Sequence, residues 1–158
     1  MIEICTTGGY GHTETSFFDS LAAAGVDVLV DVRQRRGMRG RQYAFLNSRA
    51  LQDELQRRGI AYLHLKALAP PAVLRSVQKE TDQKSGITKR ERAHLSPEFA
   101  SAYRTGVLES VDGDEVLQSM TQFQRPCLFC VERHPDACHR SLVAEWLGRR
   151  TGCFIRHL

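Results

Sequence analysis

The chain has 158 residues, 42% hydrophobic and 25% charged, a composition typical of one globular domain. No apolar run approaches the roughly 18 residues of a membrane span, and the N-terminal residues lack the basic and apolar regions of a secretory signal, so we expect a soluble, cytoplasmic protein. The formal net charge of +4 rests mainly on arginine, whose planar fork favours phosphate or carboxylate partners, although a coding bias would give the same count.

The first half of the chain predicts strands and helices in alternation. Strands are expected over residues 2–6, 26–32 and 60–65. The second of these, VDVLVDV, is almost all β-branched or apolar, which is typical of a parallel strand covered on both faces. The first helix should be capped by Thr13 or Thr15 and end at Gly25, and the second should be capped by Asn47 or Ser48 and end at Gly59. Two such units in succession predict right-handed crossovers.

Residues 66–95 interrupt this alternation with APP, a mixed stretch and the charged run KRER. We expect a partly helical excursion here that is mobile or lid-like. The sequence SPEF then has a Ser cap followed by Pro at the first helical position, so a helix should begin after Ser96. The remaining expected elements are a helix over 112–122, a strand over 126–131, a helix over 138–149 and a strand over 153–158.

No repeat, linker or low-complexity segment divides the chain. The sequence therefore predicts a single α/β domain over residues 1–158. We expect a three-layer sandwich around a mostly parallel, Rossmann- or flavodoxin-like sheet of about five strands.

Residues with reactive side chains follow four of the predicted strands. In open parallel sheets, ligands bind beyond the carboxyl ends of the strands, at a topological switch point. The residues that should meet at this rim are Gly8, Gly9, Gly11, His12, Thr13, Asp31, Arg33, His64, Cys130, Glu132, Asp136, Cys138, His139 and Arg140. Random placement would scatter such residues over both ends of the sheet, so their convergence predicts the location of a functional site.

The segment CVERHPDACHRS, residues 130–141, leads from the fourth of these strands into a helix. We expect Asp136 or Cys138 to cap this helix, whose N-terminus favours an anion and lowers the pKa of a thiol. With Arg140 and Ser141 in the first turn, phosphate binding is a reasonable prediction. Alternatively, Arg140 only pairs with Glu132 or Asp136.

A second basic segment, residues 31–41, holds five arginines beside Tyr43 and Phe45. Basic residues interleaved with aromatic ones fit a nucleotide or nucleic-acid contact through phosphates and stacked bases. A solvated charged loop would look the same. The glycines of the first turn imitate part of a dinucleotide fingerprint, but Glu14 occupies the third glycine position and would repel a pyrophosphate.

The cysteines are an odd set of five, which argues against a disulfide framework in a protein expected inside the cell. Cys127-x-x-Cys130 with Cys138 and His139 could supply soft ligands to zinc. On a strand, however, Cys127 and Cys130 point to opposite faces, unlike the usual zinc knuckle. Zinc on Cys130, Cys138 and His139 therefore stays an alternative, no other cofactor is predicted, and Cys5, Cys127 and Cys153 are interpreted as small apolar residues within strands.

Two residues are candidates for the chemistry itself. Cys138 has His139 beside it and a helix N-terminus, as a reactive thiol requires, although the Cys-x5-Arg loop of phosphatases is absent. Glu132, at a strand end near imidazoles, could be a general base or stabilise a cationic transition state, as in the cleavage of an N-glycosidic bond. Alternatively, Glu132 holds Arg140 or a backbone turn.

These motifs resemble the family known as domain of unknown function 488. The resemblance covers nearly the whole chain and rests on Gly11-His12-Thr13, LVDVR, Phe45-Leu46-Asn47, GIAYLHL, Cys130-Val131-Glu132 and Cys138-His139-Arg140-Ser141-Leu142. It implies the α/β sandwich and the site residues, and it brings no general activity. The family's leucine-glycine-glycine after the histidine strand is replaced here by residues 66–71.

Together these observations predict an enzyme, a hydrolase or transferase, that acts on a nucleotide or a nucleic-acid component. The residues expected to carry the chemistry are Glu132, Cys138, His139, Asp31 and His12. Those expected to bind phosphate or substrate are Arg33, Arg140, Ser141, Gly11, Thr13, His64 and Tyr43. The alternatives are a non-catalytic nucleotide- or nucleic-acid-binding module and a metal- or thiol-dependent protein using Cys130, Cys138 and His139.

Overall fold

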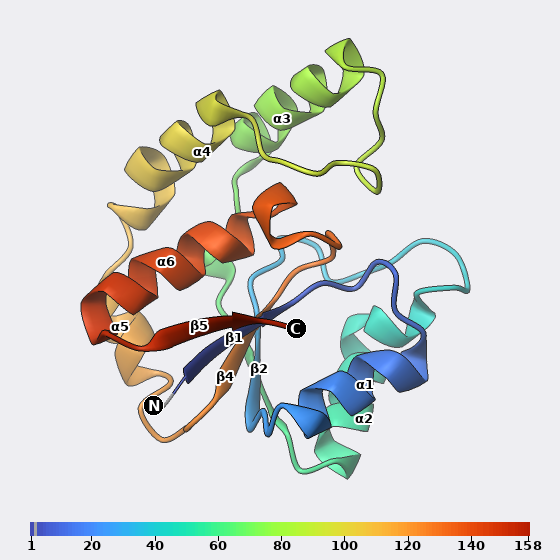
Figure 1. Ribbon diagram of the computed structural model, residues 1–158, viewed down its shortest axis with the longest axis vertical. Coiled ribbons are helices and arrows are strands. Elements are labelled where there is room, and N and C mark those ends of the chain that lie inside the picture. The colour runs from blue at the N-terminus through green and yellow to red at the C-terminus, as the bar shows by residue number, and fades with distance from the viewer. Residues whose placement is uncertain (2) are drawn as a thin grey trace.

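Five short strands form one parallel sheet in the computed structural model of the protein, which describes residues 1 and 3–158 (Figure 1). The strands are β1 Glu3–Thr7, β2 Val28–Asp31, β3 Ala61–His64, β4 Pro126–Phe129 and β5 Phe154–His157. Each of β2 to β5 lies within a predicted strand, whereas β1 continues one residue beyond the predicted range, to Thr7, and Ile2 is outside the described residues. The α/β class and the five strands are confirmed, and all the strand pairs are parallel.

The strand order is β3-β2-β4-β1-β5. Strands β1 and β2, which are neighbours in both the Rossmann and the flavodoxin orders, are here separated by β4. The segment 130–141 therefore leaves the central strand of the sheet, where the carboxyl ends of two neighbours flank it.

Helices cover both faces of the sheet, which gives the predicted three layers (Figure 1). They are α1 Glu14–Ala23, α2 Ser48–Arg57, α3 Ala72–Lys84, α4 Pro97–Tyr103, α5 Gly113–Gln118 and α6 His139–Thr151. Apolar side chains of α1 and α2 pack against one face of the sheet, and those of α4, α5 and α6 pack against the other. None of the described helices is long and apolar enough to cross a membrane.

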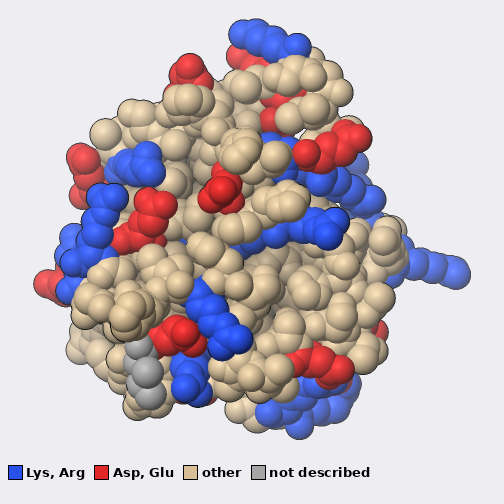
Figure 2. Space-filling view, in the orientation of Figure 1, with Lys and Arg blue, Asp and Glu red and all other residues tan. Residues whose placement is uncertain are grey.

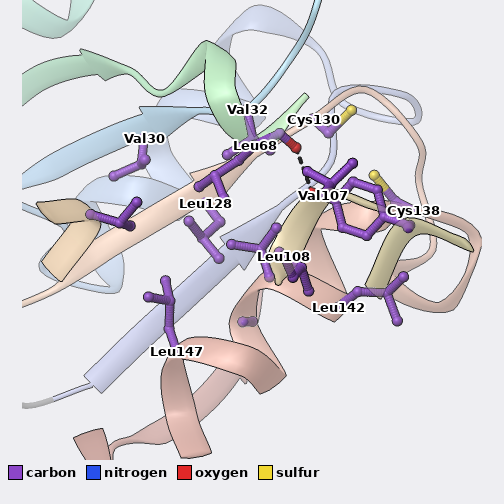
Figure 3. Packing of buried hydrophobic residues seen from close by; sticks show 14 of the residues in the cluster. Val30, Val32, Leu68, Val107, Leu108, Leu128, Cys130, Cys138, Leu142 and Leu147 are labelled. Carbon is purple, nitrogen blue, oxygen red and sulfur yellow. Dashed lines mark hydrogen bonds between the residues drawn. The ribbon is translucent and has the colours of Figure 1, made fainter. Parts of the chain in front are cut away.

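Alternation along β4 decides which cysteine belongs to which face. Cys127 lies in the cluster beneath α1 and α2, whereas Cys130 lies in the opposite cluster with Cys138. Figure 3 shows the sulfur atoms of Cys130 and Cys138 at one end of that second cluster. The prediction that Cys127 and Cys130 point apart is confirmed. Cys5 is buried within β1, and Cys153 lies just before β5.

Helix starts agree in part with the predicted caps. Thr13 caps α1 in a reciprocal capping box with Ser16, and Ser96 caps α4. Asn47 has the cap position of α2, but its side chain accepts from the Met38 N–H instead. The helix predicted over 112–122 ends earlier, at Gln118.

The start of α6 differs from the prediction in one respect that matters for the site. Cys138 has the cap position, but its side chain makes no capping hydrogen bond, and Asp136 lies in a preceding 3-10 turn, Pro135–Ala137. The predicted side-chain cap from either residue is therefore wrong. The thiol of Cys138 is instead turned toward Glu132 and His139.

The excursion over residues 66–95 contains a 3-10 turn, Lys66–Leu68, and the thirteen-residue helix α3. Helix α3 packs against α4, and the segment after it returns across the carboxyl edge of the sheet (Figure 1). Arg92 holds this return in place, because its guanidinium donates to the carboxylate of Asp82 on α3 and to the carbonyl of Ala137.

Candidate functional site

A cavity of about 710 Å³ lies beyond the carboxyl ends of β2 and β4. Its walls are the loop after β2 (residues 33–39), helix α3 and the segment 87–95, and its base is formed by Cys130, Val131, Glu132, Ala137 and His139. We call it the basic pocket because of the lining described below. Its position is the one where ligands bind in open parallel sheets.

Glu132, at the base of the basic pocket, is almost fully buried and its two carboxylate oxygens have different partners. Oε2 lies 3.1 Å from Cys130 Sγ and 3.0 Å from Cys138 Sγ. Oε1 lies 3.1 Å from Lys89 Nζ and 3.7 Å from an Arg92 nitrogen. Burial raises the pKa of a carboxyl group, but Lys89, His139 and the two thiols outweigh it here and hold the pKa of Glu132 well below its usual range.

The two thiols at the base influence each other. The pKa of Cys130 is raised by the hydrogen bond to Cys138, by burial and by the neighbouring carboxylate. Burial also opposes ionisation of Cys138, but the Cys130 hydrogen bond and the nearby His139 and Arg140 lower the pKa of Cys138. Cys138 is therefore the sulfur that gives up its proton first.

His139 is the first residue of α6 and the third member of this cluster, beside Glu132 and the two thiols. Its Nε2 lies 3.0 Å from the carbonyl oxygen of Val32, so that nitrogen carries the proton and donates it. The other nitrogen, Nδ1, faces Cys138 Sγ at 3.8 Å. Burial lowers the pKa of an imidazole, yet the thiolate of Cys138 and Glu132 together raise that of His139. Tyr103 of α4 packs edge-on against the ring.

The lining of the basic pocket is strongly cationic. Lys or Arg occupies eight of its positions, against the carboxylates of Asp82 and Glu132: Arg33, Arg35, Arg39, Arg75, Lys79, Lys89, Arg90 and Arg92. Figure 2 shows Lys and Arg side chains in the furrow below the part of the chain that carries α3. Five of the eight form no ion pair with described residues: Arg35, Arg39, Arg75, Lys79 and Arg90. The buried Nε of Arg75 also lacks a hydrogen-bond partner among the described residues.

Aromatic rings border the same pocket. Tyr10 lines it and meets Tyr43 edge to face, with ring centroids 5.2 Å apart, whereas Tyr43 itself is buried and is not among the lining residues. The guanidinium of Arg90 lies over both rings, 5.2 Å from the centroid of Tyr10 and 5.4 Å from that of Tyr43. The hydroxyl of Tyr43 accepts a hydrogen bond from the Gly11 N–H, which fixes the turn after β1.

Asp31 and Arg33, predicted at the end of the second strand, form a buried pair. The guanidinium of Arg33 donates to both carboxylate oxygens of Asp31, at 2.9 and 2.8 Å, and to the carbonyl of Leu46. Tyr62 donates its hydroxyl proton to the same carboxylate, and His64 contacts the Arg33 carbonyl. Arg33 lines the basic pocket, whereas Asp31 is completely buried behind it.

Arg140 is also almost completely buried, and it is not among the residues that line the pocket. It donates to the backbone carbonyls of Glu132 and Arg133, at 2.6 and 3.1 Å. The hydroxyl of Ser141 donates to the Cys138 carbonyl within the first turn of α6. Neither of the anticipated pairings of Arg140, with the Glu132 or the Asp136 carboxylate, is among the contacts of the described residues.

The predicted residues of the first turn lie further from the basic pocket. His12 contacts the hydroxyl of Ser16 on α1, and Thr13 caps that helix. Gly11 has a positive φ of 92°, which only glycine adopts readily, and supports Tyr43 through its N–H. The structure thus brings Glu132, Cys138, His139 and Arg33 together, but not His12, Gly11 or Thr13.

Sequence reasoning missed the wall supplied by the excursion. Lys89, Arg90 and Arg92 all belong to the charged run KRER, which the sequence marks plainly. Its composition was a usable signal of a binding segment, but its partner was not apparent. Lys89 and Glu132 are separated by more than forty positions, and only the return of the segment after α3 brings them together.

Comparison with curated proteins and with solved structures found no match. A family model described as Domain of unknown function DUF488 matches residues 14–147. The matched region extends from α1 into α6 and contains the base of the basic pocket and most of its lining. Because the match covers most of the chain, the protein belongs to the DUF488 family.

Proposed function

We propose that the protein is an enzyme acting on a phosphate-bearing substrate, a nucleotide or a nucleic-acid component, bound in the basic pocket. The observation that carries this proposal is the lining, in which cations without ion-pair partners surround buried Cys130, Glu132 and His139. An anion held by this cationic wall would lie next to the buried reactive side chains.

The phosphate contacts come from the walls of the pocket rather than from Arg140. Arg75 supports this assignment, because it lines the pocket and its buried Nε has no hydrogen-bond partner among the described residues, which a phosphate oxygen would supply. The Nε of Arg140 also lacks a partner among the described residues, but Arg140 does not line the pocket. Exposed Arg39 on the opposite wall adds a second cation. The N-terminus of α6, at Ala137 and His139, reaches the same space with a favourable helix dipole.

A nucleobase fits the aromatic border of the pocket. Tyr10 and Tyr43 already hold a planar cation, Arg90, over their rings. A base that displaces Arg90 from the Tyr10 ring stacks on the face that Arg90 leaves, at a gain of about 1–3 kcal/mol per base. Cationic side chains that bind phosphate on one side of the pocket, and an aromatic ring for stacking on the other, favour a nucleotide unit over an inorganic anion.

Hydrolysis or group transfer is the class of reaction that the residues at the base of the pocket support. Glu132 has hydrogen-bonding or ionic neighbours at both oxygens, so it serves as a fixed negative charge. Such a carboxylate stabilises positive charge that develops in a transition state, as in cleavage of an N-glycosidic bond. Cys138 and His139 supply a nucleophile and a proton-transfer group next to it.

The binding half of the proposal is tested by thermal melting with a panel of inorganic phosphate, mononucleotides, NAD and short DNA and RNA. A ligand at about 100 times its Kd adds roughly 2.7 kcal/mol to the stability. We expect Arg90→Ala to weaken the best ligand by at least about tenfold, or 1.4 kcal/mol. The matched control is Arg149→Ala, an exposed cation of α6 outside the pocket, which should bind as the wild type does. No shift with any phosphate ligand would overturn the proposal.

The catalytic half is tested with Glu132→Gln. We expect this variant to bind the ligand with the wild-type Kd while product formation, followed by chromatography and mass spectrometry, falls by at least about 100-fold. A wild-type protein that binds ligand but forms no product would instead indicate a non-catalytic binding module.

A further inference from the structure

Three side chains with soft ligand atoms meet at the base of the basic pocket. Cys130 Sγ, Cys138 Sγ and His139 Nδ1 all lie within 4.8 Å of one another, and no other group of this kind occurs among residues 1 and 3–158. We propose that these three residues bind a divalent transition metal ion of the zinc class. The inference deepens the proposed function, on which it rests for the substrate that the ion would meet. With the ion bound, Cys138 and His139 are its ligands and no longer the nucleophile and the proton-transfer group.

The orientation of His139 is that of a metal ligand. Its Nε2–H donates to the Val32 carbonyl at 3.0 Å, which leaves Nδ1 facing Cys138 Sγ at 3.8 Å. Histidines that bind metals almost always donate their other ring N–H to a carbonyl or carboxylate in this way. The bond is long-range in sequence, since Val32 follows β2 and His139 begins α6, so the sheet itself fixes the ring.

The spacing of the ligand atoms is also suitable. Zinc bonds of about 2.3 Å to sulfur and 2.0 Å to nitrogen, at a tetrahedral angle, separate the two atoms by about 3.5 Å. The distance from Cys138 Sγ to His139 Nδ1 is 3.8 Å. This pair is therefore already close to the separation of two zinc ligands, and Cys130 Sγ lies within 4.8 Å of both atoms.

The charges around the thiols favour a cation among them. Both sulfurs lie within 3.1 Å of Glu132 Oε2, so two thiols and a carboxylate oxygen share a buried space. Lys89 and Arg92 approach only the other oxygen, Oε1. A proton or a metal ion must stand between Oε2 and the sulfurs, and two thiolates with an imidazole select zinc over harder cations.

The site is open to substrate. Cys130 and His139 line the basic pocket, and three protein ligands leave the fourth position of a tetrahedral ion free for water or a substrate atom. Glu132 also lines the pocket and contacts both cysteines. Three ligands with an adjacent carboxylate are the arrangement by which zinc sites act on a bound water.

The first experiment is elemental analysis of protein purified without a polyhistidine tag and without chelators. We expect about one zinc ion per chain in the wild type and less than about one tenth in Cys130→Ser and Cys138→Ser. Cys153→Ser is the matched control, because Cys153 lies before β5, outside the trio, and should retain the metal. A wild type with less than about half an ion per chain, which also fails the cobalt titration below, overturns the inference.

A second measurement decides the matter if the buried serine variants do not fold. Wild-type protein stripped with a chelator is titrated with Co²⁺, and we expect a thiolate-to-cobalt charge-transfer band that saturates at one ion per chain. Absence of the band overturns the inference. Thermal melting of the stripped protein with the phosphate panel separates the two proposals. If phosphate ligands bind but no metal site is found, the proposed function stands and the metal site is rejected. If a metal site is found but no phosphate ligand binds, the metal site stands and the proposed function is rejected.

Discussion

The Asp31 carboxylate is important for stability because it neutralises the buried guanidinium of Arg33. It is completely buried and receives two hydrogen bonds from the equally buried guanidinium of Arg33, with another from Tyr62. Removing one partner of a buried ion pair leaves an uncompensated charge, at a cost of about 3–5 kcal/mol. We therefore expect Asp31→Asn to lower the free energy of unfolding by about 3 kcal/mol, measured by urea denaturation.

The control for this prediction is Asp19→Asn. Asp19 is 62% exposed and pairs with Arg58 at the surface, where such a pair contributes about 0–1 kcal/mol. Equal effects of the two substitutions would show that the Asp31–Arg33 pair does not stabilise the fold.

Arg140 is the second residue whose role depends on the direction of its side chain. Its guanidinium satisfies the carbonyls of Glu132 and Arg133 from behind the pocket base. We expect Arg140→Met to cost about 2 kcal/mol in unfolding free energy, because two acceptors lose their donor. The affinity of the folded variant for a phosphate ligand should stay within about twofold of the wild type, measured by calorimetry. A variant of wild-type stability that binds phosphate tenfold more weakly would instead place Arg140 in the anion site.

At the scale of elements, the turn after β1 supports the base of the pocket through a close backbone approach. A Cβ atom on Gly8 would lie 2.1 Å from the carbonyl oxygen of Glu132, the residue at the centre of the site. We expect Gly8→Ala to cost about 2 kcal/mol or more in unfolding free energy and to weaken ligand binding, because the loop after β4 must move away. Denaturation and ligand titration measure the two effects.

Gly37 provides the matched control in the opposite wall of the pocket. A Cβ there meets nothing within 4 Å and the backbone does not require a positive φ. Gly37→Ala should therefore change stability by less than about 0.5 kcal/mol. A Gly8→Ala variant as stable as this control would mean that the β1 turn and the β4 loop are not in contact.

The base of the pocket can be predicted from the sequence, but its walls cannot. Cys130, Glu132, Cys138 and His139 lie within ten positions at the end of a strongly apolar strand, so local pattern and the rule for parallel sheets place them at the rim. The walls depend on contacts that no periodicity encodes. Arg92 reaches Asp82 and Ala137, and the Ser96 N–H donates to Gln78 on α3.

Side-chain direction is the other limit of the sequence. A helix start with an arginine predicts an anion site equally well whether the guanidinium faces outward or, as for Arg140, inward onto carbonyls. The same holds for the cysteines: strand alternation separates Cys127 from Cys130 correctly. The approach of Cys138 to Cys130, by contrast, depends on the 3-10 turn that leads into α6.

At the scale of the whole molecule, the net positive charge is small, but Lys and Arg side chains are concentrated in the basic pocket. The formal net charge is only +4, yet eight Lys and Arg side chains line one pocket beside two carboxylates. A protein that contacts nucleic-acid phosphates releases condensed counterions, so the logarithm of its affinity falls linearly with the logarithm of the salt concentration. The slope counts the phosphate contacts, which makes it a direct measure of how the pocket is used.

We expect binding of a short single-stranded oligonucleotide to weaken with salt, and Arg39→Ala to reduce the magnitude of the slope by about one contact. Arg39 is exposed at the rim of the pocket without an ion-pair partner among the described residues, whereas Arg149→Ala, outside the pocket, should leave the slope unchanged. Fluorescence anisotropy over a series of salt concentrations measures both. A slope near zero in the wild type would exclude a polymer as ligand, because a single nucleotide has no condensed counterions to release, and would restrict the substrate to free nucleotides. Equal reductions by Arg39→Ala and Arg149→Ala would mean that the general charge of the molecule, rather than the basic pocket, attracts the strand.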